Sequence, residues 1–301
     1  MLKGGGCVRS IAFFDLEVNP ESGKILDYGA VDAAGNPLHT QSPAVFAEYI
    51  KGKGYLCGHN IIAHDLQYLQ STISVGETVH CIDTLCLSPL LFPSRPYHKL
   101  LKDDKLQTDE LNNPLNDAVK ARDLFHDEVN AYLALSPDLQ KVYCSLLADQ
   151  KEFSGFFHYM GAHPTGETAL LIQKVFEGKI CANCRLSAMI ANHPIALAYC
   201  LALITAEDEH SITPKWVHYQ YPVVETFMRL LRNTPCGNCS YCSRELNIHH
   251  WLKRSFGYDS FRTYDGEPLQ ENAARARCME RLCWQFFPQA AENPLHSSYP
   301  L

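Results

Sequence analysis

The sequence predicts an α/β domain with a mixed sheet flanked by helices, followed by a mostly α-helical unit. Three observations lead to this expectation. Up to about residue 134, short β-rich runs alternate with segments of helical spacing. From about residue 136, helical segments follow one another without strand signals between them, and cysteines begin to cluster. The length of 301 residues suggests about two domains.

Local patterns predict each element of the α/β part. Residues 10–16 and 24–33 are β-rich runs separated by turn signals at Asn19-Pro20 and Ser22-Gly23. Further along the chain, the patterns predict a helix over 44–51, a short buried strand over 55–57, a helix over 61–69 and a strand over 79–83.

The longest amphipathic pattern closes this first part. Pro89, Pro93 and Pro96 are expected to break the chain into a loop. Residues 115–133 then repeat apolar side chains mostly at three- and four-residue steps, which predicts a helix. A domain boundary is expected near residues 134–137.

Composition and charge exclude several classes of protein. Apolar residues make up 46% and charged residues 20%, which is typical of a globular chain and excludes wholesale disorder. The longest clean apolar stretch, 195–204, is about half of a membrane span, and residues 1–10 hold no secretory apolar region. We therefore expect a cytoplasmic protein without a membrane partner. The net charge of −7 means that a nucleic acid would be held by local patches or bridging cations.

Four acidic residues are candidate metal ligands. Asp15 and Glu17 lie two apart on a predicted strand, so both side chains emerge on one face. Asp65 follows the segment GHNIIAH, where a strand passes into a helix, and Asp117 opens the amphipathic helix. Each of them alone is typical of a solvated edge or a helix first turn. Converging carboxylates are the expected ligands of hard divalent cations.

In this order and spacing, the four residues resemble the DEDD superfamily of 3′–5′ exonucleases, which have the DnaQ-like, ribonuclease H-like fold. The first family motif is similar to Phe13-Phe14-Asp15-Leu16-Glu17. The second is similar to Gly58-His59-Asn60 through Asp65-Leu66, and the third to Asn116-Asp117-Ala118. The resemblance covers about residues 8–134.

The resemblance implies a two-metal hydrolysis of phosphodiester bonds. Two Mg²⁺ or Mn²⁺ ions would be held by the four acidic residues, with Asp15 bridging both. One ion would activate a water for in-line attack and the other would stabilise the leaving 3′ oxygen. The cations would also turn an acidic pocket into one that attracts phosphate.

The general base departs from the pattern of the family's histidine subgroup. Asn112 stands where that subgroup places a histidine, and an amide cannot accept the proton of water. His126 follows Asp117 by nine residues and should face away on a straight helix. His98 is our catalytic candidate, with His64 as a second. Catalysis without a protein base, or a weakened nuclease, remains an alternative.

Two cysteine pairs predict one structural zinc ion. Cys181 and Cys184 form one CxxC pair, Cys236 and Cys239 form another, and Cys242 extends the second. Thiolate pairs at this spacing suit tetrahedral Zn²⁺, whereas buried thiols or a redox pair are the alternative. The symmetry of the two pairs selects the first four cysteines. The second pair also resembles the zinc segment of RecQ-family helicases, in which Cys242 would bind too, so Cys242 stays an alternative ligand.

The C-terminal part resembles the opening of a RecQ-family helicase. The match runs from residues 252–262, LKRSFGYDSFR, to Gln270. When residues 284–300 are back-translated into codons, with the degenerate bases chosen favourably, another reading frame of that coding sequence contains a Gly-rich GGGKS loop. We therefore expect four parts: a DEDD-type exonuclease domain over 1–135, a helical zinc-binding domain over 136–250, the start of a RecQ-like segment over 251–277, and an out-of-frame tail over 278–301.

The sequence thus predicts a metal-dependent 3′–5′ exonuclease acting on single-stranded or 3′-ended DNA, associated with a helicase module. Two alternatives stay open. One is a catalytically weak or inactive nucleic-acid-binding module that tethers a helicase. The other is an exoribonuclease.

Overall fold

The computed structural model describes most of the chain before residue 232. The described residues are 10–73, 76, 78–95, 98, 100, 113–164, 166–180, 184–206 and 213–231. By its contacts the chain forms two compact units. The first comprises Met1–Thr168 and Leu201–Trp216, and the second comprises Ala169–Cys200 and Val217–Leu301.

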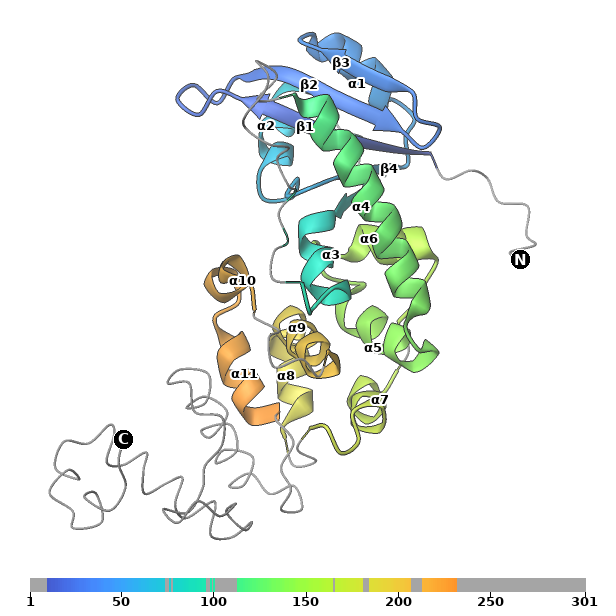
Figure 1. Ribbon diagram of the computed structural model, residues 1–301, viewed down its shortest axis with the longest axis vertical. Helices are drawn as coiled ribbons and strands as arrows, with labels where there is room; N and C mark the ends of the chain where they lie inside the picture. Colours follow the sequence, from blue (N-terminus) through green and yellow to red (C-terminus); the bar gives the residue numbers. More distant parts are fainter. Residues whose placement is uncertain are drawn as a thin grey trace, which may run out of the picture. The chain divides into compact units, whose positions relative to one another are not determined.

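In the part of the chain that the structure describes, the first unit is built on a mixed sheet of five strands (Figure 1). Its strands are β1 (Ile11–Val18), β2 (Ile25–Asp32), β3 (Pro37–Thr40), β4 (Tyr55–Gly58) and β5 (His80–Asp83). Their order across the sheet is β3-β2-β1-β4-β5. The hairpin strands β1, β2 and β3 run antiparallel, while β4 and β5 run parallel to β1. The expected α/β fold with a mixed sheet is confirmed.

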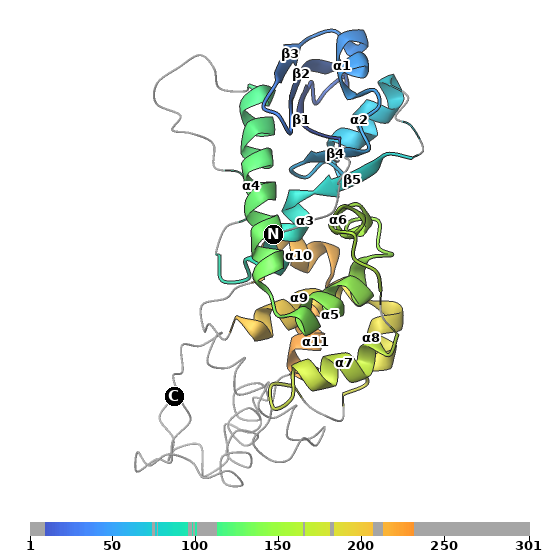
Figure 2. The ribbon, with the colours of Figure 1, turned by 90° about the vertical axis from the view of Figure 1, so that its right-hand side faces the viewer.

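Helices cover both faces of this sheet (Figure 2). One face is covered by α1 (Pro43–Ile50) and α2 (Asp65–Thr72), whose Phe46 and Leu69 join a buried apolar cluster with Phe14. The other face carries α4 (Pro114–Ala134), which packs against β1 and β2. The sheet is therefore the middle layer of three.

The buried side chains of β1 explain this arrangement. Phe14 contacts Phe46 of α1 with ring centroids 5.9 Å apart, whereas Phe13 contacts Phe125 of α4 at 5.6 Å. Successive strand side chains point to opposite faces, so one strand contributes to both layers.

Three details of this unit differ from the expectation. The short strand β3 was not expected. The helix expected over 61–69 begins only at Asp65, because residues 61–64 form turns. The loop expected at Pro89 is wrong, since Pro89 lies inside α3 (Thr84–Leu91). All eight residues of α3 are buried, and this burial outweighs the hydrogen bond that the proline removes.

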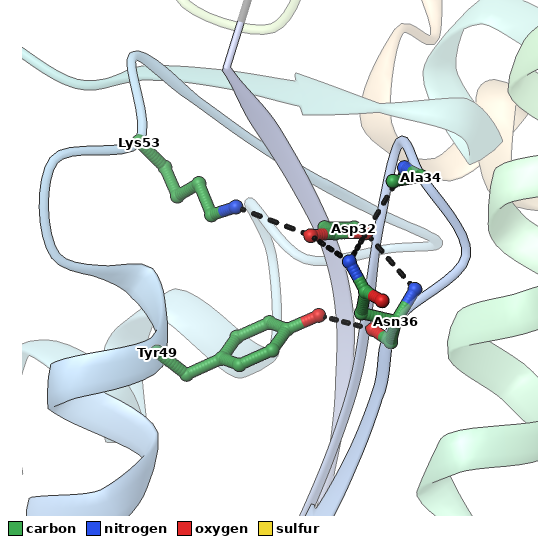
Figure 3. Close-up of polar contacts among 5 residues, drawn as sticks. All are labelled: Asp32, Ala34, Asn36, Tyr49 and Lys53. Atoms are coloured by element: carbon green, nitrogen blue, oxygen red, sulfur yellow. Dashed lines mark hydrogen bonds and ion pairs between the residues drawn. The ribbon is translucent and has the colours of Figure 1, made fainter.

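A polar cluster closes the turn between β2 and β3 (Figure 3). The Asp32 carboxylate accepts the N–H groups of Ala34 at 2.9 Å and of Asn36 at 3.0 Å. It also lies 3.6 Å from the Lys53 ammonium, and the Tyr49 hydroxyl donates to the carbonyl of Asn36. These contacts join the turn to Tyr49 of α1 and to Lys53, which follows that helix.

Every regular element described after Ala134 is a helix, as expected. The first unit continues with α5 (Pro137–Leu147) and α6 (Ser154–Met160). The remaining helices are α7 (Thr168–Val175), α8 (Leu186–Asn192), α9 (Pro194–Thr205), α10 (Lys215–Gln220) and α11 (Val223–Leu231). Among the described residues, no helix combines the length and apolar character needed to cross a membrane. The expected helicase segment and tail lie outside the described residues.

Candidate active site

The carboxylates of the first motif project from the α4 side of the sheet. Asp15 and Glu17 follow Phe13 at two-residue steps along β1, and Phe13 packs on Phe125 of α4. Alternation along a strand therefore places both acids on that same face. Both side chains are half-buried, near the carboxyl end of the strand.

The start of α4 lies beside Asp15. Gly29 of β2 is the cross-strand partner of Asp15. A Cβ built on Gly29 would lie 2.1 Å from the backbone nitrogen of Leu115, so only glycine permits this approach of the helix. Asp117 is in the first turn of α4, two helical steps of four residues before Phe125, and therefore belongs to the stripe that faces β1.

Asp65 reaches the same end of the sheet from the other side. The pairing of β4 with β1 extends from Ile11 to Phe13 and ends before Leu16. The Leu16 N–H donates to Oδ1 of Asp65 at 3.2 Å, and Asp65 is only 2% exposed. The Asp65 carboxylate thus sits against the backbone between Asp15 and Glu17.

Sequence reasoning missed a fifth acid in this region. Asp27 of β2 is the cross-strand partner of Glu17, so both carboxylates share one face. Like charges directly opposite one another destabilise a sheet. Part of this cost is offset by His39 of β3, whose Nε2 lies 2.6 Å from Oδ2 of Asp27. The strand pairing of β1 with β2 was the signal that could have revealed Asp27.

Burial makes the charge of Asp65 costly. Burial raises the pKa of Asp65 to about 6, while His64 and the Leu16 N–H act in the opposite direction. The His64 Nδ1 lies 3.6 Å from Oδ2 of Asp65. A cation at this position would offset the cost of the buried negative charge.

The donors at this end of β1 suit a hard divalent cation. All are carboxylate oxygens, the ligand type that Mg²⁺ and Mn²⁺ prefer. In the part of the chain that the structure describes, however, no three His, Cys, Asp or Glu side chains are grouped closely enough to hold an ion as they stand. The carboxylates would therefore have to turn toward one another on binding a metal.

The candidate base His98 has different neighbours. It is buried, and its Nδ1 is hydrogen-bonded to Ser88 Oγ of α3 at 2.8 Å. Burial, together with the nearby Arg95, lowers the pKa of His98 to about 4. His64, in contrast, contacts the carboxylate of Asp65, and its side chain is about half-exposed.

The remaining histidine and asparagine positions add little. His126 is exposed, as expected from its phase on the helix, although its ring lies 6.1 Å from that of Phe13. Asn112 falls outside the described residues.

The expected zinc site also falls almost wholly outside them. Of its five cysteines only Cys184 is described, and it is half-buried just before α8. Its carbonyl accepts the N–H of Leu186 at 2.9 Å. Cys181, Cys236, Cys239 and Cys242 lie outside the described residues, so the zinc site stays a prediction.

A cavity of about 240 Å³ lies elsewhere, beside edge strand β5. It is lined by Leu66 and Gln70 of α2 together with His80, Lys151 and others. None of the acids at the end of β1 lines it, so it is separate from the candidate site.

Comparisons with protein-family models, curated proteins and solved structures found no match to this chain.

Proposed function

We propose that this chain is a metal-dependent 3′–5′ exonuclease that hydrolyses phosphodiester bonds at the 3′ end of DNA. One observation carries the proposal. Acids from three separate segments approach the carboxyl end of β1, and Asp65 bonds the backbone between Asp15 and Glu17. A mixed sheet flanked by helices is compatible with the ribonuclease H-like fold that the motifs indicate.

The residues would divide the work as follows. Asp15, Glu17, Asp65 and Asp117 would hold two Mg²⁺ or Mn²⁺ ions, which when bound supply Lewis-acid activation of water and charge stabilisation at the leaving oxygen. The Leu16 N–H would keep the Asp65 carboxylate oriented. His64 would accept the proton of water, because its exposed ring stands next to Asp65.

The first test is a cleavage assay with both nucleic acids. The chain is incubated with 5′-labelled single-stranded DNA or RNA in Mn²⁺, Mg²⁺ or EDTA. We expect a ladder that shortens from the 3′ end of DNA, requires the metal and disappears in Asp15→Asn. Glu48→Gln is the matched control, because Glu48 is an exposed acid of α1 whose ion pair is with Lys51.

Other outcomes select the other functions. Cleavage of RNA in preference to DNA would identify an exoribonuclease. Metal-independent binding of DNA with no cleavage would overturn the enzyme and support a binding module that tethers a helicase. His64→Gln tests the base: we expect slower cleavage at neutral pH with unchanged binding of Mn²⁺.

We also propose one structural zinc ion held by Cys181, Cys184, Cys236 and Cys239, with Cys242 as the alternative ligand. Paired thiolates at CxxC spacing support it. Metal analysis of the purified chain should find about one zinc per molecule and less in Cys184→Ser. Full zinc content in that variant, with loss in Cys242→Ser, would reassign the ligands.

A further inference from the structure

The loop between β4 and α2 is held by a carboxylate outside the candidate site. Asp83, at the end of β5, accepts the Asn60 N–H at 2.8 Å and the Ile62 N–H at 3.0 Å. Its Oδ1 also accepts the Leu85 N–H at 3.0 Å, which caps α3. The Cys86 backbone also bonds to Asp83, which is 1% exposed, so backbone donors surround a side chain that solvent does not reach.

Thr84 extends this clamp. Its hydroxyl donates to the carbonyl of Gly58 at 3.2 Å and is hydrogen-bonded to Nδ1 of His59 at 2.9 Å. The pair Asp83-Thr84 thus contacts the loop at Gly58, His59, Asn60 and Ile62.

The loop needs an external clamp because its path is tight. A Cβ on Gly58 would lie 2.5 Å from the carbonyl oxygen of Phe14 and 2.4 Å from the side chain of Ile61. Asn60 has φ +67°, a left-handed backbone conformation that residues other than glycine rarely adopt. Hydrogen bonds to a buried carboxylate offset the cost of holding this conformation.

The clamped residues lead directly to Asp65. The His64 N–H donates to the carbonyl of Asn60 at 3.1 Å, and the Leu66 N–H donates to that of Ile61 at 2.9 Å. The position of Asp65 therefore depends on the clamp on one side and on the Leu16 N–H on the other.

We propose that Asp83 is a positioning residue for the candidate metal site: through the loop over residues 59–64 it sets the place of Asp65 without touching metal or substrate. This inference rests on the proposed function. Groups that orient a metal ligand typically change metal affinity by about 10- to 100-fold when removed.

Two substitutions separate the clamp from the helix cap. Asp83→Ser keeps an N-cap for α3 but is too short to reach both Asn60 and Ile62. Thr84→Val keeps the side-chain shape and removes only the hydroxyl contacts to Gly58 and His59. The control Ser136→Ala removes an ordinary helix cap, the Ser136 Oγ that accepts the Leu139 N–H at 3.3 Å at the start of α5.

The experiment measures three quantities on the full chain: the Mn²⁺ concentration for half-maximal cleavage, the melting temperature, and the hydrogen exchange of the segment 60–69 without metal. In Asp83→Ser we expect half-saturation to rise by about 10- to 100-fold, with excess Mn²⁺ restoring much of the rate, and exchange of the segment to accelerate. Thr84→Val should shift the Mn²⁺ half-saturation and the hydrogen exchange of the segment in the same direction, but by less. Ser136→Ala should change neither the half-saturation nor the exchange.

The outcomes for the two proposals differ. Unchanged half-saturation and unchanged exchange in a folded Asp83→Ser would overturn the positioning role. If Asp83→Ser does not fold, the same two readouts in Thr84→Val decide. Absence of cleavage in the unsubstituted chain would overturn the exonuclease instead, while exchange of the segment would still show whether Asp83 holds the loop.

Discussion

The two faces of β1 differ in composition, although they belong to one strand. The even-numbered residues Ala12, Phe14 and Leu16 are buried in the apolar cluster under α1 and α2. The odd-numbered residues are the buried Ile11 and Phe13, followed by the half-buried Asp15 and Glu17. The even-numbered face therefore packs in the apolar cluster, whereas the odd-numbered face carries acids near the start of α4. Alternation along β1 therefore keeps Asp15 and Glu17 apart from the apolar cluster on the opposite face.

The largest effect should come from the acidic face. In Asp15→Asn we expect cleavage to fall by about 1,000-fold, equivalent to about 4 kcal/mol, because a ligand proposed to bridge both ions is lost. The melting temperature should stay the same or rise, since one of several neighbouring like charges is removed. Single-turnover cleavage and calorimetry check the two parts. A large drop in melting temperature would show that Asp15 is structural.

A substitution on the even-numbered face of β1 should lower stability and leave metal binding unchanged. Phe14 is 0% exposed and contacts Phe46, so Phe14→Ala should lower the free energy of unfolding by about 3–5 kcal/mol. Urea unfolding measures this loss. Below the melting point the folded fraction should keep a Mn²⁺ half-saturation close to that of the parent. A rise in half-saturation of about 10-fold or more would contradict the separation of the two faces.

The next largest effect on stability and metal binding is expected where β2 contacts the start of α4. Gly29→Ala would place a Cβ 2.1 Å from the Leu115 nitrogen and push the first turn of α4, with Asp117, away from β1. We expect a loss of about 1–3 kcal/mol in stability together with weaker Mn²⁺ binding. In the control Gly54→Ala the nearest atom is the Ser10 oxygen at 3.8 Å, an ordinary contact. Equal losses in the two variants would argue against the close approach.

The sequence anticipated the acidic face better than the loop that supports it. Alternation along β1 and the helical spacing before Phe125 are local patterns, so they placed Asp15, Glu17 and Asp117 correctly on their elements. The partnership of Asp27 with Glu17 depends on strand register, and that of Asp83 with Asn60 joins residues 23 positions apart. No local pattern encodes either pairing. Pro89 is a case in which a local pattern misled: proline is a helix-breaking signal, but α3 forms around it because the whole helix is buried.

The smallest effect concerns Glu128, an acid of α4 that is not among the four proposed metal ligands. Glu128 is 0% exposed, and in the described part of the chain neither carboxylate oxygen has a hydrogen-bond partner. Burial raises the pKa of Glu128 well above its ordinary value of 4.5, Asp83 raises it further, and Arg95 acts in the opposite direction. Between 4.5 and that raised pKa the folded state binds more protons than the unfolded state, so the free energy of unfolding falls as pH rises.

Glu128→Leu removes this pH-dependent loss. At about pH 8 we expect its free energy of unfolding to exceed that of the parent by about 1–3 kcal/mol, and by less at about pH 5. Urea unfolding at the two pH values measures the difference, with Asp123→Asn, an exposed acid of the same helix, as the control that should show no gain. A less stable Glu128→Leu at the higher pH would mean that the ionised carboxylate has a stabilising partner.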